Sequence, residues 1–263
     1  MQVRLDGRTA LITGGSLGVG RAIATRFVEA GARVVIAARR AEVLEGARAE
    51  IAAVAGTAPF AVAADVADAA GCVRLVREAE AAAGPIDILV NNAGTSKRSR
   101  FLDIDDATWQ ADLDLKLFGA IRLARLLAPG MIERRWGRII NVLNTGAKAP
   151  PAEGAPTAVS RAAGMALTKV LAGELAPHNV LVNALLVGRI KSDQWVRRHA
   201  AAAAEGSNAT LDDYYAEMGK AIPMRRVGEA EEFSAVACLL ASDLGGYVTG
   251  TAINVDGGAC PVV

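Results

Sequence analysis

The chain has 263 residues, of which 52% are hydrophobic and 22% are charged, and this composition is typical of a globular protein with a sizeable core. Its 29 basic and 28 acidic side chains leave a net charge of +1, which excludes a general electrostatic attraction to nucleic acid or to an anionic membrane. No stretch reaches the roughly 20 apolar residues that a membrane-spanning helix needs.

Short strands rich in β-branched residues alternate with helix-length segments along the chain. In the first half, each strand is followed by a helix, with strands at 9–12, 33–37 and 60–63 and helices at 18–30, 41–54 and 68–83. The second half continues with a strand at 88–90, a long helical stretch at about 107–134, a strand at 138–142, a helix at about 156–176, and strands at 180–187 and 252–255.

Strands that are separated by helix-length crossovers must pair in parallel. The pattern therefore predicts an α/β fold with a doubly wound parallel sheet, the Rossmann fold, in three α/β/α layers and as one domain over residues 1–263. One irregular region, at about 191–224, lies between two strands, and we expect it to form a helical flap beside the ligand.

A glycine-rich turn, Thr13-Gly14-Gly15-Ser16-Leu17-Gly18-Val19-Gly20, directly follows the first strand and opens the first helix. Glycines in this position let a diphosphate approach backbone N–H groups, and the helix dipole adds attraction for its negative charge. The turn favours nucleotide binding, with a purely structural tight turn as the alternative.

The spacing of Thr13-Gly14, Gly18 and Gly20 resembles that of the short-chain dehydrogenase/reductase family. The resemblance extends along the chain through Asp65-Val66, Asn91-Asn92-Ala93-Gly94, Val182-Asn183-Ala184, Pro223, Arg226 to Gly228, Tyr247 to Gly250, and Asp256-Gly257-Gly258. It implies that the cofactor contacts Gly14, Ser16, Leu17, Gly18, Val19, Gly20, Asp65, Val66, Asn92, Ala93, Gly94, Arg161, Gly188 and Ile190. The family has Pro-Gly where this chain has Val187-Gly188, which is a small departure.

The end of the second strand indicates which nicotinamide cofactor is preferred. An acidic residue there would bind the ribose 2′ hydroxyl of NAD, whereas this chain has Arg39 and Arg40. Because a guanidinium presents a planar fork to a phosphate, NADP(H) is favoured over NAD(H). A solvated pair of arginines at a helix start is the alternative.

The catalytic positions depart from the family pattern. The resemblance places Thr157 at the usual tyrosine, Arg161 at the usual lysine, Asn144 at the usual serine and Lys116 at the usual asparagine. A threonine hydroxyl does not ionise usefully and an arginine stays protonated, so the usual proton donor is missing. Asn144 can still donate an amide N–H to a carbonyl oxygen.

Lys116 is the sharpest candidate for a replacement acid, because burial and a nearby Arg161 would both lower its pKa. The alternative is a salt bridge to Asp112 or Asp114 on the same helix. The phenols of Tyr214 and Tyr215 in the flap could also reach the site on closure, although aromatic packing explains them as well.

Several cations fall in segments that converge on the presumed substrate end of the sheet, namely Lys116, Lys148, Arg161, Arg189 and Lys191. If they point inward, they indicate an anionic small-molecule substrate. Neutralisation by Glu153 and Asp193 is the alternative.

The leading hypothesis is an NADP(H)-dependent oxidoreductase that acts on a carbonyl or a secondary alcohol with an unusual acid. A catalytically inactive nucleotide-binding subunit and a lyase or isomerase that uses Lys116 remain open. The resemblance implies a homo-dimer or homo-tetramer. The three cysteines, Cys72, Cys238 and Cys260, have neither disulfide nor zinc spacing, so we expect a cytoplasmic protein with no metal.

Overall fold

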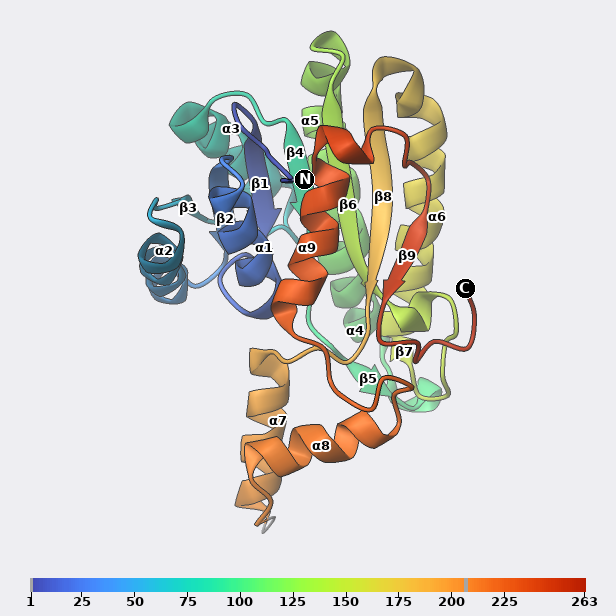
Figure 1. Ribbon diagram of the computed structural model, residues 1–263. Coiled ribbons are helices and arrows are strands. Elements are labelled where there is room, and N and C mark those ends of the chain that lie inside the picture. Colours follow the sequence, from blue (N-terminus) through green and yellow to red (C-terminus); the bar gives the residue numbers. More distant parts are fainter. Residues whose placement is uncertain (1, 206–207) are drawn as a thin grey trace.

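The computed structural model describes residues 2–205 and 208–263. In the described residues, seven parallel strands form one sheet in the order β3-β2-β1-β4-β6-β8-β9 (Figure 1). They are β1 Thr9–Thr13, β2 Arg33–Ala38, β3 Phe60–Ala63, β4 Ile88–Asn91, β6 Gly137–Asn144, β8 Val180–Val187 and β9 Ala252–Val255. The single-domain, doubly wound parallel sheet predicted from the sequence is confirmed.

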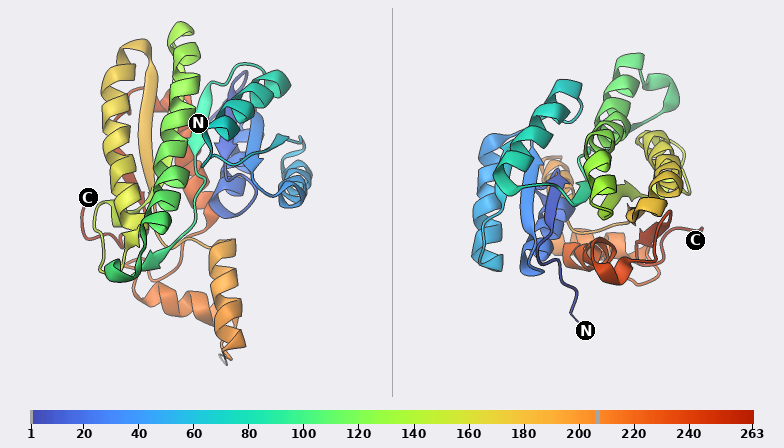
Figure 2. Two further views of the ribbon diagram at one scale, coloured as in Figure 1. Left: turned by 180° about the vertical axis from the view of Figure 1, so that it is seen from behind. Right: turned by 90° about the horizontal axis from the view of Figure 1, so that it is seen from above.

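Helices cover both faces of the sheet, which gives three layers (Figure 2). One face carries α1 Gly18–Glu29, α2 Ala41–Ala55 and α9 Ala230–Ala241, and the other carries α3 Ala69–Ala83, α5 Gly119–Glu133 and α6 Thr157–Leu175. Each face has its own apolar core: Phe27 and Phe233 are fully buried on the first, and Leu75 on the second. Strands covered on both sides have nearly continuous apolar sequences, as do β1, apart from its terminal threonines, and β8, apart from Asn183.

Strand order reverses between β1 and β4, because β1 pairs with β2 on one side and with β4 on the other. The crossovers on either side of this point lead the chain away in opposite directions. A crevice opens there outside the carboxyl ends of the strands, where doubly wound sheets bind their ligands. The turn between β1 and α1 lies at this crevice.

Two helices extend beyond the carboxyl ends of the strands, α7 Asp193–Ala204 and α8 Leu211–Lys220, and they form the lower part of the molecule in Figure 1. They fall within the region where the sequence predicts a flap. That this unit covers a ligand remains a prediction.

Three elements differ from the sequence expectation. The long helix predicted at 107–134 is interrupted: α4 Asp106–Leu113 leads into one π-helical turn, Asp114–Phe118, before α5 begins. A π turn holds one extra residue, and such turns often occur at functional sites. Helix α9 was not predicted, since its sequence is apolar almost all round. The short antiparallel pair of β5 Arg98–Ser99 and β7 Ala155–Pro156 is too brief for any periodicity to reveal.

Candidate functional site

The glycine-rich turn is shaped for close contact with a ligand. Gly14 has a φ of +64°, which L side chains rarely adopt, and a Cβ on Gly20 would collide with the backbone carbonyl of Gly14. Helix α1 starts with no side-chain cap and no acidic residue in its first turn. Its N-terminal N–H groups are therefore available to an anion.

A groove of about 480 Å³ begins at this turn and runs along the ends of β1, β2, β3 and β4. The groove is lined by many of the residues assigned to the cofactor from the sequence: Gly14, Ser16, Leu17, Gly18, Val19, Gly20, Arg39, Arg40, Asp65, Val66, Asn92, Ala93 and Gly94. Arg39 and Arg40 are exposed. Neither takes part in an ion pair within the described part of the chain.

The side-chain amide of Asn92 is bonded to the backbone at the floor of this groove and is not free to bind a ligand. Its Nδ2 donates to the carbonyl oxygens of Thr13 at 2.9 Å and Gly14 at 3.1 Å, and its backbone N–H donates to the Thr13 hydroxyl at 3.0 Å. These bonds tie the end of β4 to the end of β1. Beside it, Asn91 donates to Asn141 at 2.9 Å and its buried Oδ1 has no partner among the described residues.

A second groove, of about 570 Å³, continues from the first and shares Val19, Asn92 and Gly94 with it. It lies between the ends of β6 and β8, the start of α6 and the start of α7. Asn144, Thr157, Arg161, Gly188 and Ile190 all line it, so the structure brings together three of the four candidate catalytic residues. The fourth, Lys116, does not line this groove; it borders a separate void of about 10 Å³ beside Asn91 at the end of β4.

Lys116 lies in the π turn and is part of a buried polar cluster. Its side chain is 0% exposed and that of Asp112, one turn earlier, is 1% exposed; the two form an ion pair. The Lys116 Nζ also donates to the Thr157 Oγ1 at 2.8 Å, and the Ser160 hydroxyl donates to the other Asp112 oxygen at 2.6 Å. The salt-bridge alternative is thus confirmed for Asp112, whereas Asp114 pairs with Arg122 at 2.9 Å.

The surroundings of Lys116 change its acidity. Burial lowers the pKa of Lys116 to about 8; the hydrogen bond that Lys116 donates to Asp112 opposes this shift, and the nearby positive charge of Arg161 adds to it. The ammonium can therefore lose a proton close to neutral pH. Thr157 connects it to the groove, because the same hydroxyl that accepts from Lys116 lies at the groove wall and donates to the Lys97 carbonyl oxygen at 2.6 Å.

Arg161 is held at the junction of the two grooves. One of its terminal nitrogens donates to the Val142 carbonyl oxygen at 2.8 Å, while its buried Nε has no partner among the described residues. A Cβ on Gly94 would lie 2.5 Å from the other terminal nitrogen, so the guanidinium occupies the space that glycine leaves. Burial lowers the pKa of Arg161 to about 10, and the side chain is still protonated at neutral pH.

Asn144 offers an uncommitted amide to the second groove. Its side chain makes no hydrogen bond to any described residue, and its Oδ1 is buried. Buried polar side-chain atoms without a partner are uncommon, and a polar ligand in the groove is one way to satisfy this one. Neither Tyr214 nor Tyr215 lines this groove. They pack against each other with ring centroids 6.4 Å apart.

The cations predicted to converge do so only in part. Arg161 and Arg189 line the second groove, but Lys148 donates to the Ala252 carbonyl oxygen at 2.7 Å and Lys191 pairs with Glu229 at 2.6 Å. Two arginines that the sequence analysis missed, Arg98 and Arg198, also line it. No periodic pattern could have found them, since they lie on a two-residue strand and on α7.

Comparisons with known proteins agree with this geometry. The sequence profile of the family described as Enoyl-(Acyl carrier protein) reductase matches residues 14–260. The chain is 37% identical to Oxidoreductase UcpA of Escherichia coli, covering 97% of this chain and 95% of that protein, and 33% identical to 3-oxoacyl-[acyl-carrier-protein] reductase FabG of Aquifex aeolicus, covering 98% and 99%. Its structure is similar to that of L-sorbose reductase of Gluconobacter frateurii complexed with NADPH and L-sorbose, with a TM-score of 0.94 and 32% identity over 100% of both chains.

No helix in the described part of the chain combines the length and the apolar character needed to cross a membrane.

Proposed function

Because the chain belongs to the short-chain dehydrogenase/reductase family, we propose that it is an NADP(H)-dependent oxidoreductase that interconverts a carbonyl and a secondary alcohol on a small anionic substrate. The observation that carries the proposal is the continuity of the two grooves. A dinucleotide laid along the first would end where Asn144 and Thr157 face the second. The L-sorbose reductase structure, which contains NADPH, supports the choice of cofactor.

The residues of the first groove fit a dinucleotide with a 2′ phosphate. The uncapped start of α1 and the bare backbone at Gly20 suit the diphosphate, and Arg39 and Arg40, which have no ion pair among the described residues, suit the additional phosphate. Arg161 packs against Gly94, which lines both grooves, and its Nε, without a partner among the described residues, would bind the ribose next to the nicotinamide. When bound, the nicotinamide supplies or accepts a hydride at the substrate carbon.

The chain's own residues would supply the proton during reduction. Asn144 would donate a hydrogen bond that orients the carbonyl oxygen, and the Thr157 hydroxyl would turn from the Lys97 carbonyl and pass its proton to that oxygen as the alcohol forms. Lys116 would protonate Thr157 Oγ1 in the same step, so that no threonine alkoxide forms, and would become a neutral amine beside Asp112. In alcohol oxidation each proton moves in the opposite direction.

The test is a turnover assay over a range of pH, with NADPH and a panel of ketones that carry a carboxylate or a phosphate. Reduction needs the Lys116 ammonium, which is present below a pKa of about 8, so the rate falls as pH rises through about 8. Alcohol oxidation needs the neutral amine and rises through the same range. Lys116→Arg loses most of the turnover at every pH in this range, because a guanidinium stays protonated and cannot give its proton to Thr157. Tight NADPH binding without turnover would instead identify a nucleotide-binding subunit.

Cofactor preference has its own expected result. Replacing both Arg39 and Arg40 with Ala weakens NADPH binding by about 100-fold or more, since two charge-assisted hydrogen bonds of roughly 1.5–3 kcal/mol each are lost. Binding of NADH, which lacks the phosphate, stays within about twofold on the same reasoning. Fluorescence titration measures both, with Arg74→Ala/Arg77→Ala on the exposed side of α3 as the matched control. An equal loss for NADPH and NADH contradicts this assignment.

Two expectations accompany the proposal. Self-association as a homo-dimer or homo-tetramer is supported by apolar side chains exposed on α5 and α6, such as Leu126 and Val170. A cytoplasmic location is supported by the three free cysteines.

A further inference from the structure

The second groove carries an unbalanced positive charge. Four arginines line it, Arg98, Arg161, Arg189 and Arg198, and none of its described lining residues is Asp or Glu. The two carboxylates that could have neutralised it lie elsewhere. Glu153 pairs with Arg100 at 3.4 Å, and Asp193 lines the neighbouring cavities but not this one.

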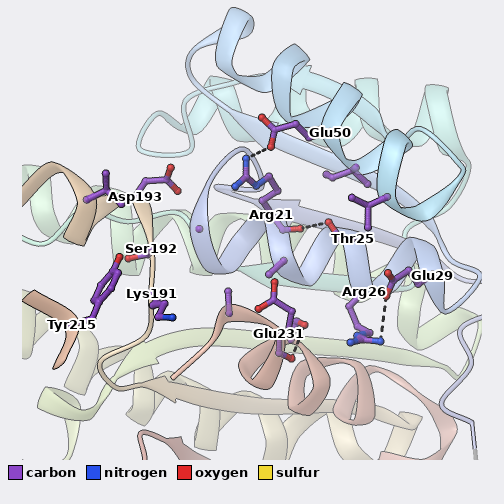
Figure 3. Close-up of a pocket in the computed structure, with 17 residues that line it drawn as sticks. Arg21, Thr25, Arg26, Glu29, Glu50, Lys191, Ser192, Asp193, Tyr215 and Glu231 are labelled. Atoms are coloured by element: carbon purple, nitrogen blue, oxygen red, sulfur yellow. Dashed lines mark hydrogen bonds and ion pairs between the residues drawn. The ribbon is translucent and has the colours of Figure 1, made fainter. Parts of the chain in front are cut away.

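Another cavity of similar size shows the usual arrangement for comparison. It measures about 480 Å³ and lies between α1, α9 and the start of α7 (Figure 3). There Arg21 pairs with Glu50 and Arg26 pairs with Glu29 at 3.2 Å. Both of these arginines are therefore paired with carboxylates, whereas no described residue that lines the second groove is a carboxylate.

Two of the four arginines, Arg98 and Arg198, come from segments far apart in the chain, and Arg198 makes a hydrogen bond to the segment that precedes Arg98. Arg98 lies on β5, is exposed, and has no ion pair among the described residues. Arg198 lies on α7 with its guanidinium carbon 4.8 Å from the centre of the Trp195 ring, and it donates to the Ser96 hydroxyl at 3.4 Å. This contact connects α7 to the loop that leads into β5.

The remaining two arginines have other commitments. Arg161 donates to the Val142 carbonyl oxygen at the junction with the cofactor groove, and Arg189 donates to the Met218 carbonyl oxygen at 3.1 Å. Among the described residues, the side chain of Arg98 makes no hydrogen bond and that of Arg198 makes only the long one to Ser96, so these two arginines keep most of their N–H donors for a ligand in the groove. A planar guanidinium with free N–H groups binds a carboxylate or a phosphate in preference to other ligands.

We propose that Arg98 and Arg198, together with Ser96, form a subsite that binds the oxyanion group, carboxylate or phosphate, of the substrate. This rests on the proposed function for the identity of the reacting carbonyl, which lies at Asn144 and Thr157 in the same groove. The groove volume of about 570 Å³ suits a small molecule that carries both groups. The stacking of Arg198 on Trp195 keeps its guanidinium oriented before the ligand binds.

The first experiment needs no turnover. Inorganic phosphate and acetate are titrated separately into protein saturated with NADP⁺, and binding is followed by Trp195 fluorescence, which Trp195→Phe identifies. Arg98→Gln lowers the affinity for the anion that binds more tightly by about tenfold or more, as expected for the loss of one charge-assisted hydrogen bond. Arg100→Gln, on the same loop but paired with Glu153, leaves the affinity unchanged. If Arg98→Gln and Arg100→Gln have the same effect on the affinity for the anion, the proposed subsite is wrong.

The second experiment separates this subsite from the proposed function. Three ketones of matched size, one neutral, one with a carboxylate and one with a phosphate, are compared in wild type, Arg98→Gln and Arg198→Gln. We expect each variant to raise KM for an anionic ketone by about tenfold or more and to leave the neutral ketone unchanged. Anion binding that depends on Arg98 without any turnover supports the subsite and contradicts the proposed function. Turnover of all three ketones with equal KM would support the proposed function and contradict the subsite.

Discussion

Replacing Thr157 with Val should lower the rate of carbonyl reduction by about 10²- to 10⁴-fold, the contribution usual for a positioned proton donor. The change is nearly isosteric, and it removes the hydroxyl that links Lys116 to the groove at 2.8 Å. Because Thr157 does not line the cofactor groove, NADPH affinity stays the same. Single-turnover absorbance of NADPH with a saturating ketone measures the effect on the chemical step.

Two variants control for that result. Thr157→Ser keeps a hydroxyl at the same place and retains most of the activity. Thr168→Val makes the same change on the same helix, where the hydroxyl is bonded to Gly164 and Asn141 and lies outside the groove, so the rate is maintained. Comparable losses in the two valine variants would show that the helix, and not the Thr157 hydroxyl, is responsible.

Replacing Lys116 with Met should lower the free energy of unfolding by about 3–5 kcal/mol, because it leaves a charge buried without its partner. Asp112 is 1% exposed, and without Lys116 the Ser160 hydroxyl is the only side chain in the described part of the chain that still makes a hydrogen bond to it. The midpoint and slope of chemical denaturation, at one protein concentration, give the change.

A double variant separates the buried charge from the loss of packing. Asp112→Leu/Lys116→Met removes both charges and regains much of the stability, since an apolar pair of similar volume often replaces a buried ion pair with little loss. Both variants lack the proton donor, so both lose reduction. A single Lys116→Met variant as stable as wild type would mean that Asp112 is hydrated or protonated in the folded protein.

The order of strands and helices could be predicted from local pattern, because buried parallel strands and amphipathic helices differ in period and length. Helix α9 could not, since a segment with apolar residues on most sides lacks the stripe that marks a one-sided helix. The π turn could not either. Asp114–Phe118 continues a helical pattern without interruption, and only packing against neighbouring elements places the extra residue there.

The sequence alone determined the glycine-rich turn and its position between β1 and α1, since glycine spacing and strand context are local properties. It also showed which residue types occupy the four positions that the family uses for proton transfer. Only the tertiary structure decided which charged side chains meet. It placed Lys116 against Asp112 and Thr157, removed Lys148 and Lys191 from the groove, and brought in Arg98 and Arg198. Whether a charge is paired depends on residues far apart in the chain, and a local sequence pattern does not show which distant residues come into contact.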